Sequence, residues 1–139
     1  MKLPIVWLND YINKDFDIDE LENSFTLSGT KVEEIIKPYD KIKKVYTGKI
    51  REIKAHKDAD KLVICDVDMG DLGDLQIVTA ATNMKEGDIV PVAMHKARLF
   101  DGYQIKKGKL RGEVSEGMFC SLEELGLEEE DQSEGILIL

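Results

Sequence analysis

The stretch KLRGEVSEGMFCS, residues 109–121, joins features that seldom occur together. Two cations lead into Gly112, and a second glycine, Gly117, stands directly before the apolar pair Met118 and Phe119. Glycine permits backbone turns that other residues rarely adopt. A buried strand needs no cations, and a simple surface turn needs no apolar pair. We therefore expect a turn at an exposed rim, after which the chain returns to a hydrophobic core.

The composition is that of an ordinary globular domain, with 42% hydrophobic and 34% charged residues in 139. No apolar run is long enough to span a bilayer, and the first residues lack the apolar core of a signal peptide. Cys65 and Cys120 lie in apolar surroundings without framework spacing, which favours a reduced, cytoplasmic protein. The net charge of −9 argues against an indiscriminate nucleic-acid binder.

The charge is unevenly distributed, however. Residues 1–39 and 122–139 are acidic, whereas residues 40–121 carry a small positive net charge. Between positions 96 and 111 a single acid, Asp101, stands among six bases: Lys96, Arg98, Lys106, Lys107, Lys109 and Arg111. A local basic stripe of this kind matters more for docking a polyanion than the total charge does.

The first 39 residues predict a small α/β segment of two short helices and a strand, treated as a domain of their own (1–39). Trp7 and Tyr11 are neighbours at i, i+4 in the first helix, and Asp17 opens the second with an acidic turn. KVEEIIKP, residues 31–38, has the pattern of a short strand closed by proline.

From about residue 40 the pattern changes to short strands, and we assign residues 40–139 to a second domain. Gly48 and the spacing of Ile50 and Ile53 predict a bent or bulged first strand. A hairpin is expected at Asp101-Gly102 and a one-turn helix with a capping box at Ser121–Glu124. The five expected strands are 45–55, 61–70, 75–81, 88–94 and 135–139. The fold class is therefore mainly β, with a five-stranded OB-fold barrel favoured over a two-sheet sandwich.

No motif for catalysis or metal binding is found, so we expect neither a catalytic residue nor a metal ligand. The sequence has no phosphate-binding Gly-Lys loop, dinucleotide fingerprint or nucleophile elbow. His56 and His95 could join the two cysteines in a zinc site, but the usual close ligand pairs are missing. The loop HKDADKL, residues 56–62, has a structural interpretation through its aspartates and a functional one in which His56 or Lys61 contacts a phosphate.

The basic stripe has two interpretations. It is either a solvated strand face, as most charge runs are, or a surface for nucleic-acid phosphates. Alternation along a strand would place Lys107, Lys109 and Arg111 on one side. At the turn that follows, Ser115 and exposed amides could hold a phosphate or sugar, and Met118 offers an apolar surface to a base.

Several motifs occur in the order seen in a known family. HKDADKL, LQIVTAATN, VPVA, KKGKLRGEVSEGM-CS and ELGL resemble the tRNA-binding OB domain found in synthetase-associated proteins. The opening LPIVWLNDYI and FTLSGTKVEEI resemble the start of the bacterial phenylalanyl-tRNA synthetase β-subunit family. The sequence departs from the family pattern at His56-Lys57, where His-Pro is usual, and at Thr79–Asn83, where Cys-Gly-Ala-Pro-Asn is usual.

The resemblance implies a tRNA-binding module that supports aminoacylation of tRNA(Phe) in protein biosynthesis and is not itself an enzyme. It implies no cofactor in this chain, because the site for ATP, magnesium and phenylalanine belongs to the α subunit of an (αβ)₂ ligase. The residues expected to serve RNA binding are Lys96, Arg98, Lys107, Lys109, Arg111, Ser115, Glu116 and Met118. The alternative is a scaffold or subunit-interaction barrel with weak or no RNA binding.

The resemblance also predicts that the chain is an N-terminal fragment, cut just after the barrel. Family members continue into further domains, and the first 39 residues would pack against chain that follows residue 139. We therefore expect exposed apolar surface around Trp7, Leu8, Leu21 and Phe25, with a tendency to self-associate or to lack order. The predicted location is cytoplasmic, with no membrane partner.

Overall fold

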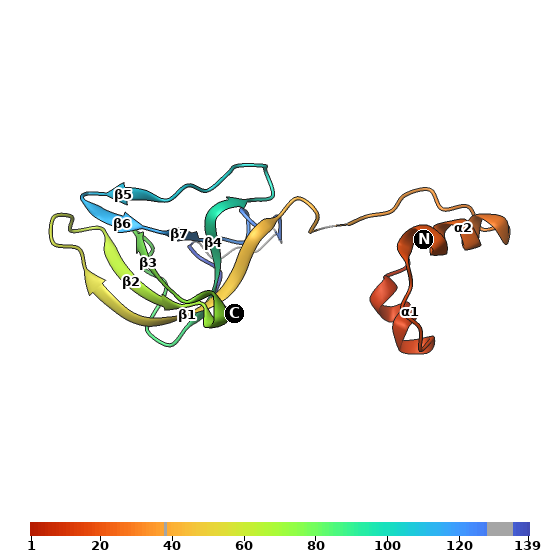
Figure 1. Ribbon diagram of the computed structural model, residues 1–139, viewed down its shortest axis with the longest axis horizontal. Coiled ribbons are helices and arrows are strands. Elements are labelled where there is room, and N and C mark those ends of the chain that lie inside the picture. The colour runs from red at the N-terminus through yellow and green to blue at the C-terminus, as the bar shows by residue number, and fades with distance from the viewer. Residues whose placement is uncertain (38, 128–134) are drawn as a thin grey trace. The chain divides into compact units, whose positions relative to one another are not determined.

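A computed structural model describes residues 1–37, 39–127 and 135–139 of the chain. The chain divides into two compact units, Met1–Lys37 and Pro38–Leu139. The first contains two helices, and the second is a curled antiparallel sheet (Figure 1). Within the described ranges, no helix has the length and apolarity needed to cross a membrane.

The first unit forms the two expected helices, α1 (Ile5–Tyr11) and α2 (Ile18–Leu27). The side chain of Asp17 caps α2 by accepting a hydrogen bond from the Glu20 amide at 3.0 Å. Neither helix buries a residue fully. The strand expected at 31–38 is wrong for 31–37, which pair with no other described segment, while position 38 lies outside the described residues.

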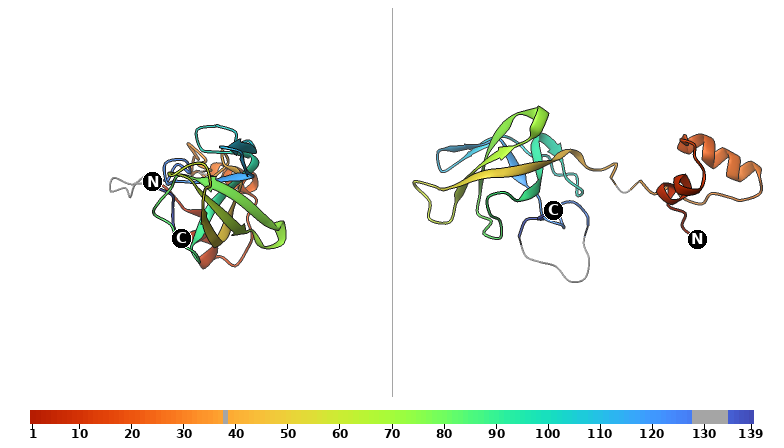
Figure 2. Two further views of the ribbon diagram at one scale, coloured as in Figure 1. Left: turned by 90° about the vertical axis from the view of Figure 1, so that its left-hand side faces the viewer. Right: turned by 90° about the horizontal axis from the view of Figure 1, so that it is seen from below.

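The second unit is the expected mainly β, OB-like barrel, built on a five-stranded sheet in the order β3-β2-β1-β4-β7. Two short strands, β5 and β6, form a separate hairpin that lies along one side of it (Figures 1 and 2). The strands are β1 (Lys43–Ala55), β2 (Val63–Asp68), β3 (Asp74–Thr79), β4 (Ile89–Arg98), β5 (Gly108–Leu110), β6 (Glu113–Ser115) and β7 (Gly117–Phe119), with a 3₁₀ turn at Gly70–Leu72.

The long strand β1 bends as its sequence predicts. Its register against β2 shifts between Ile50 and Glu52, which marks a bulge. Gly48 allows the bend to close, because a Cβ there would stand 2.6 Å from the sulfur of Met69 and 2.7 Å from a methyl of Val67. Glycine is therefore required at this point by close packing.

The core consists of two clusters of buried residues. The larger joins β1, β2, β3 and β4 around Ile50, Val67 and Ile77, and the smaller includes Ala97, Leu99, Ile105 and Cys120. Alternate residues of β2 enter the larger cluster, as the sequence pattern predicts.

The predicted turns are present, but the last strand is misplaced. Asp101-Gly102 forms a turn in which the Tyr103 amide donates to the Asp101 side chain at 2.8 Å, and Ser121 and Glu124 form the reciprocal capping box. The fifth strand of the sheet is β7, not 135–139. Among the described residues, the latter segment makes single backbone bonds, Leu137 to Cys120 and Leu139 to Ile89, and joins no ladder.

Candidate nucleic-acid interface

The β5–β6 hairpin carries two exposed cations, Lys109 in strand β5 and Arg111 on its two-residue turn. Leu110 pairs with Glu113, so Arg111 and Gly112 form the connection, with φ of 52° and 89°. Such turns need left-handed backbone at both positions and usually contain Asn-Gly, so Arg-Gly is only a weak sequence signal for this one. Lys109 and Arg111 are exposed and form no ion pair with any described residue.

The prediction that Lys107, Lys109 and Arg111 project from the same side of one strand is wrong. Strand alternation extends only over Gly108–Leu110, and Arg111 leaves the strand geometry at the turn. The hairpin therefore presents Lys109 from a strand and Arg111 from a tip, as two separately oriented cations.

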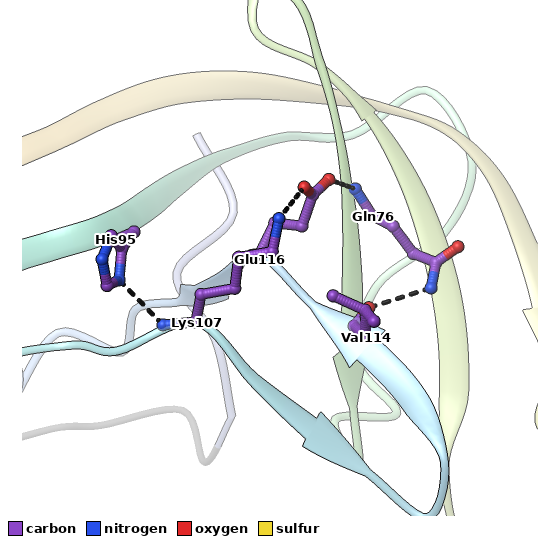
Figure 3. Close-up of polar contacts among 5 residues, drawn as sticks. All are labelled: Gln76, His95, Lys107, Val114 and Glu116. Atoms are coloured by element: carbon purple, nitrogen blue, oxygen red, sulfur yellow. Dashed lines mark hydrogen bonds and ion pairs between the residues drawn. The ribbon is translucent and has the colours of Figure 1, made fainter.

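Two histidines hold this hairpin, one at each end. His56 is buried, and its Nδ1 accepts a hydrogen bond from the Asp58 amide at 3.0 Å. Its proton must then be on Nε2, which donates to the carbonyl of Leu110 at 3.1 Å. His95 Nδ1 accepts from the Lys107 amide at 3.0 Å (Figure 3). The interpretation that gave His56 to a phosphate is wrong, because both ring nitrogens are used inside the fold.

The Ser-Glu step at positions 115 and 116 closes the barrel against β3. The buried hydroxyl of Ser115 accepts from the Val78 amide at 3.1 Å and donates to the Gly117 carbonyl at 2.9 Å. The Glu116 carboxylate accepts from the Gln76 amide at 3.1 Å, and the Glu116 amide donates to the Gln76 carbonyl at 2.8 Å. We call these four bonds the seam. Ser115 and Glu116 therefore hold strands together.

Lys107 belongs to the same network. Its ammonium lies 2.7 Å from Glu116 Oε1, while the other carboxylate oxygen faces Gln76, whose side-chain amide donates to the carbonyl of Val114 (Figure 3). Lys107, followed by the Gln76 amide, holds the pKa of Glu116 below its ordinary value. The charge of Lys107 is thus offset by a carboxylate, unlike the charges of Lys109 and Arg111.

Gly117 and Met118 follow the seam into β7. A Cβ on Gly117 would stand 2.7 Å from the backbone carbonyl oxygen of Ala93, so the strand approaches β4 more closely than any side chain permits. Met118 is half-buried against the smaller core cluster and keeps part of its surface exposed. Beyond it, burial raises the pKa of the Cys120 thiol to about 12, and burial likewise raises that of Cys65 to about 11.

Lys96 and Arg98 lie away from the hairpin tip, near the C-terminal end of β4. Arg98 pairs with Lys43 at the start of β1, whereas the hairpin tip is bonded to His56, which follows the end of β1. The predicted stripe is therefore divided between the two ends of one long strand. In the ranges with assigned structure, no three His, Cys, Asp or Glu side chains are grouped to hold a metal.

Comparisons with known proteins agree with a nucleic-acid-binding barrel. Residues 45–139 match the family model described as "Putative tRNA binding domain", so this chain belongs to that family of tRNA-binding domains. Over its whole length the chain is 56% identical to the phenylalanine–tRNA ligase beta subunit of Clostridium acetobutylicum and 55% identical to that of Clostridium tetani. It is 39% identical to the Thermotoga maritima beta subunit over 93% of the chain.

The chain spans only 16–18% of the length of these curated relatives. A solved structure, the C-terminal domain of Plasmodium vivax p43, superposes with a TM-score of 0.46 and 22% identity, covering 58% of this chain and 46% of that one.

Proposed function

We propose that the barrel is a tRNA-binding module of a phenylalanine–tRNA ligase β subunit, and that it docks tRNA through its exposed cations. One observation supports this above others. The family match covers the segment in which Lys109 and Arg111 project, without a neutralising acid among the described residues, from a hairpin fastened by two histidines. A fixed hairpin presents its charges to phosphates at little entropic cost.

The eight residues expected from the sequence take different parts in this proposal. Lys96, Arg98, Lys109 and Arg111 contact phosphates, and Met118 offers its exposed edge to a base or sugar. Lys107, Ser115 and Glu116 set the position of the hairpin through the seam and its ion pair. Phosphate contacts place the RNA, and they carry no base sequence information themselves.

The wider assignment follows from the relatives and is part of the same proposal. We infer that the chain works inside a cytoplasmic ligase that uses ATP and magnesium, together with an α subunit in an (αβ)₂ assembly. We place no catalytic residue and no cofactor in this chain. Its contribution to aminoacylation is to hold tRNA(Phe). In the N-terminal unit, Trp7 has 65% of its surface exposed, and we assign this apolar surface to association with another protein surface.

The test is binding of a tRNA(Phe) transcript at two or more salt concentrations. We compare the chain with Lys109→Gln/Arg111→Gln and with a matched control, Lys49→Gln/Lys85→Gln, which removes two exposed cations elsewhere on the barrel. Loss of two phosphate contacts lowers the slope of log affinity against log salt by about 1.4–1.8. The proposal fails if the unmodified chain, shown to be folded, binds no tRNA, or if the hairpin variant binds as the control does.

A further inference from the structure

A second group of cations lies where β1 and β4 change register. Lys43 is opposite Arg98, but the next pair along is Val45 opposite Ala93. One residue of β1, Lys44, therefore faces four residues of β4, 94–97, and the extra residues of β4 form a bulge. We call Lys43, Lys44, Lys96 and Arg98 the bulge patch.

The cations of the bulge patch point away from the core. All four are exposed, whereas Ala97, the strand neighbour of Arg98, is fully buried, so Arg98 projects to the side opposite the core. Gln104 is bridged to Arg98 in antiparallel fashion and is exposed, whereas the next residue, Ile105, is buried. Three adjacent segments thus present a lysine, an arginine and an amide side by side.

The folded chain gains little from these cations. Like charges directly opposite across two strands repel each other, and none of the ion pairs between described residues involves the bulge patch. Lys44 and Lys96 also adopt left-handed backbone, with φ of 57° and 66°, where glycine or asparagine is more easily accommodated. Strain and repulsion at one site are typical of a surface kept for a ligand.

The chemistry of the bulge patch suits a phosphodiester. A guanidinium donates to two phosphate oxygens at once, an ammonium adds a compact charge, and the Gln104 amide can donate a further bond. Close by, the ammonium of Lys41 stands 4.9 Å from the ring centroid of Phe100, whose side chain is 39% exposed. An RNA phosphate here would replace repulsion between cations with attraction to a shared anion.

We propose that the bulge patch is a second phosphate-binding point for RNA, separate from the hairpin. This inference rests on the proposed function, because it takes the same ligand, and it adds Lys43 and Lys44 of β1 to the binding surface. The two points lie at opposite ends of the 13-residue β1, which is at most about 40 Å when fully extended. One tRNA is large enough to contact both, so the two points together fix its orientation along the barrel.

The experiment measures tRNA(Phe) binding by four forms of the chain at 50 and 200 mM salt. They are the unmodified chain, the patch variant Lys43→Gln/Arg98→Gln, the hairpin variant Lys109→Gln/Arg111→Gln and the control Lys49→Gln/Lys85→Gln. We expect the patch variant to bind about tenfold more weakly at 50 mM and to lose about 1.4–1.8 from the salt slope. Circular dichroism checks that each variant is folded.

The outcomes separate the two proposals. Weaker binding and a smaller salt slope in both the patch variant and the hairpin variant, relative to the control, support two phosphate contacts on the RNA. A patch variant that binds like the control, while the hairpin variant is weakened, overturns this inference and the assignment of Arg98 to a phosphate, but leaves tRNA docking through the hairpin standing. No binding by the unmodified chain overturns both. Lys44→Gly/Lys96→Gly gives a second check, since it relieves the backbone and should raise stability while it weakens binding.

Discussion

Replacing Ser115 with alanine tests whether this residue holds the barrel or binds RNA. The Ser115 hydroxyl accepts from the Val78 amide at 3.1 Å, and both residues are buried, at 7% and 5% exposure. Alanine leaves that N–H without a partner. An unsatisfied buried donor costs about 1–3 kcal/mol, which lowers the melting temperature of a domain of roughly 100 residues by about 4–8 °C per kcal/mol.

The assay is urea unfolding followed by far-UV circular dichroism. Fluorescence would mislead, because the single tryptophan, Trp7, lies in the helical unit and not in the barrel. Thr82→Ala serves as the control, since its exposed hydroxyl bonds to none of the described residues. Hydrogen exchange at the Val78 amide should speed up in Ser115→Ala and stay unchanged in Thr82→Ala.

Two results would refute the reasoning. The first is a Ser115→Ala variant as stable as the control to within about 0.5 kcal/mol, the range of ordinary surface substitutions. The second is a Ser115→Ala variant of normal stability that has lost tRNA affinity, which would mean that the Ser115 hydroxyl binds RNA. We expect the opposite pattern, with reduced stability and unchanged affinity among folded molecules.

Three further predictions concern the same region. Gly117→Ala should cost about 1–3 kcal/mol, because its Cβ would meet a carbonyl oxygen at 2.7 Å, whereas Gly108→Ala, with open space around it, should be neutral or stabilising in the same urea titration. Lys107 holds the pKa of Glu116 below its ordinary 4.5, so the ionised carboxylate contributes its full share of folding stability above pH 4.5 and loses it as the pH falls through the lowered pKa. The stability of Glu116→Gln, measured against pH in the acid range, should therefore vary less than that of the unmodified chain. Cys120, whose pKa is raised to about 12, should resist iodoacetamide at pH 8 until urea unfolds the barrel; rapid labelling of the native chain would contradict its burial.

The sequence predicts local features of this barrel better than its long-range contacts. The alternation in β2, the bend at Gly48 and the turn at Asp101-Gly102 depend on neighbouring residues, and all are present. The strand expected at 31–38 is absent over 31–37, since the apolar pattern of a strand forms no ladder where no described segment pairs with it.

The candidate site divides in the same way. Sequence alone identified Lys109 and Arg111 as basic, but it could not show that Lys107 is paired with Glu116 or that His56 and His95 hold the hairpin. Those contacts join residues 9 to 54 positions apart, and no periodicity encodes them. The Arg111-Gly112 pair was a weak signal for the two-residue hairpin turn, in which asparagine usually precedes the glycine. Here Arg111, the cation that we assign to RNA, takes the place of that asparagine.

The seam also bears on how the chain folds. Its bonds to β3 join residues 37 and 40 positions apart, whereas β1, β2 and β3 pair with their neighbours in sequence. Closing the longer loop costs more entropy, so the three-stranded meander should form first and the seam last. Changes at Ser115 would then act mainly on the unfolding rate. How long the closed barrel survives before it opens is therefore set by a serine and a glutamate, and how fast it forms is set by a meander that pairs before either residue is bonded to it.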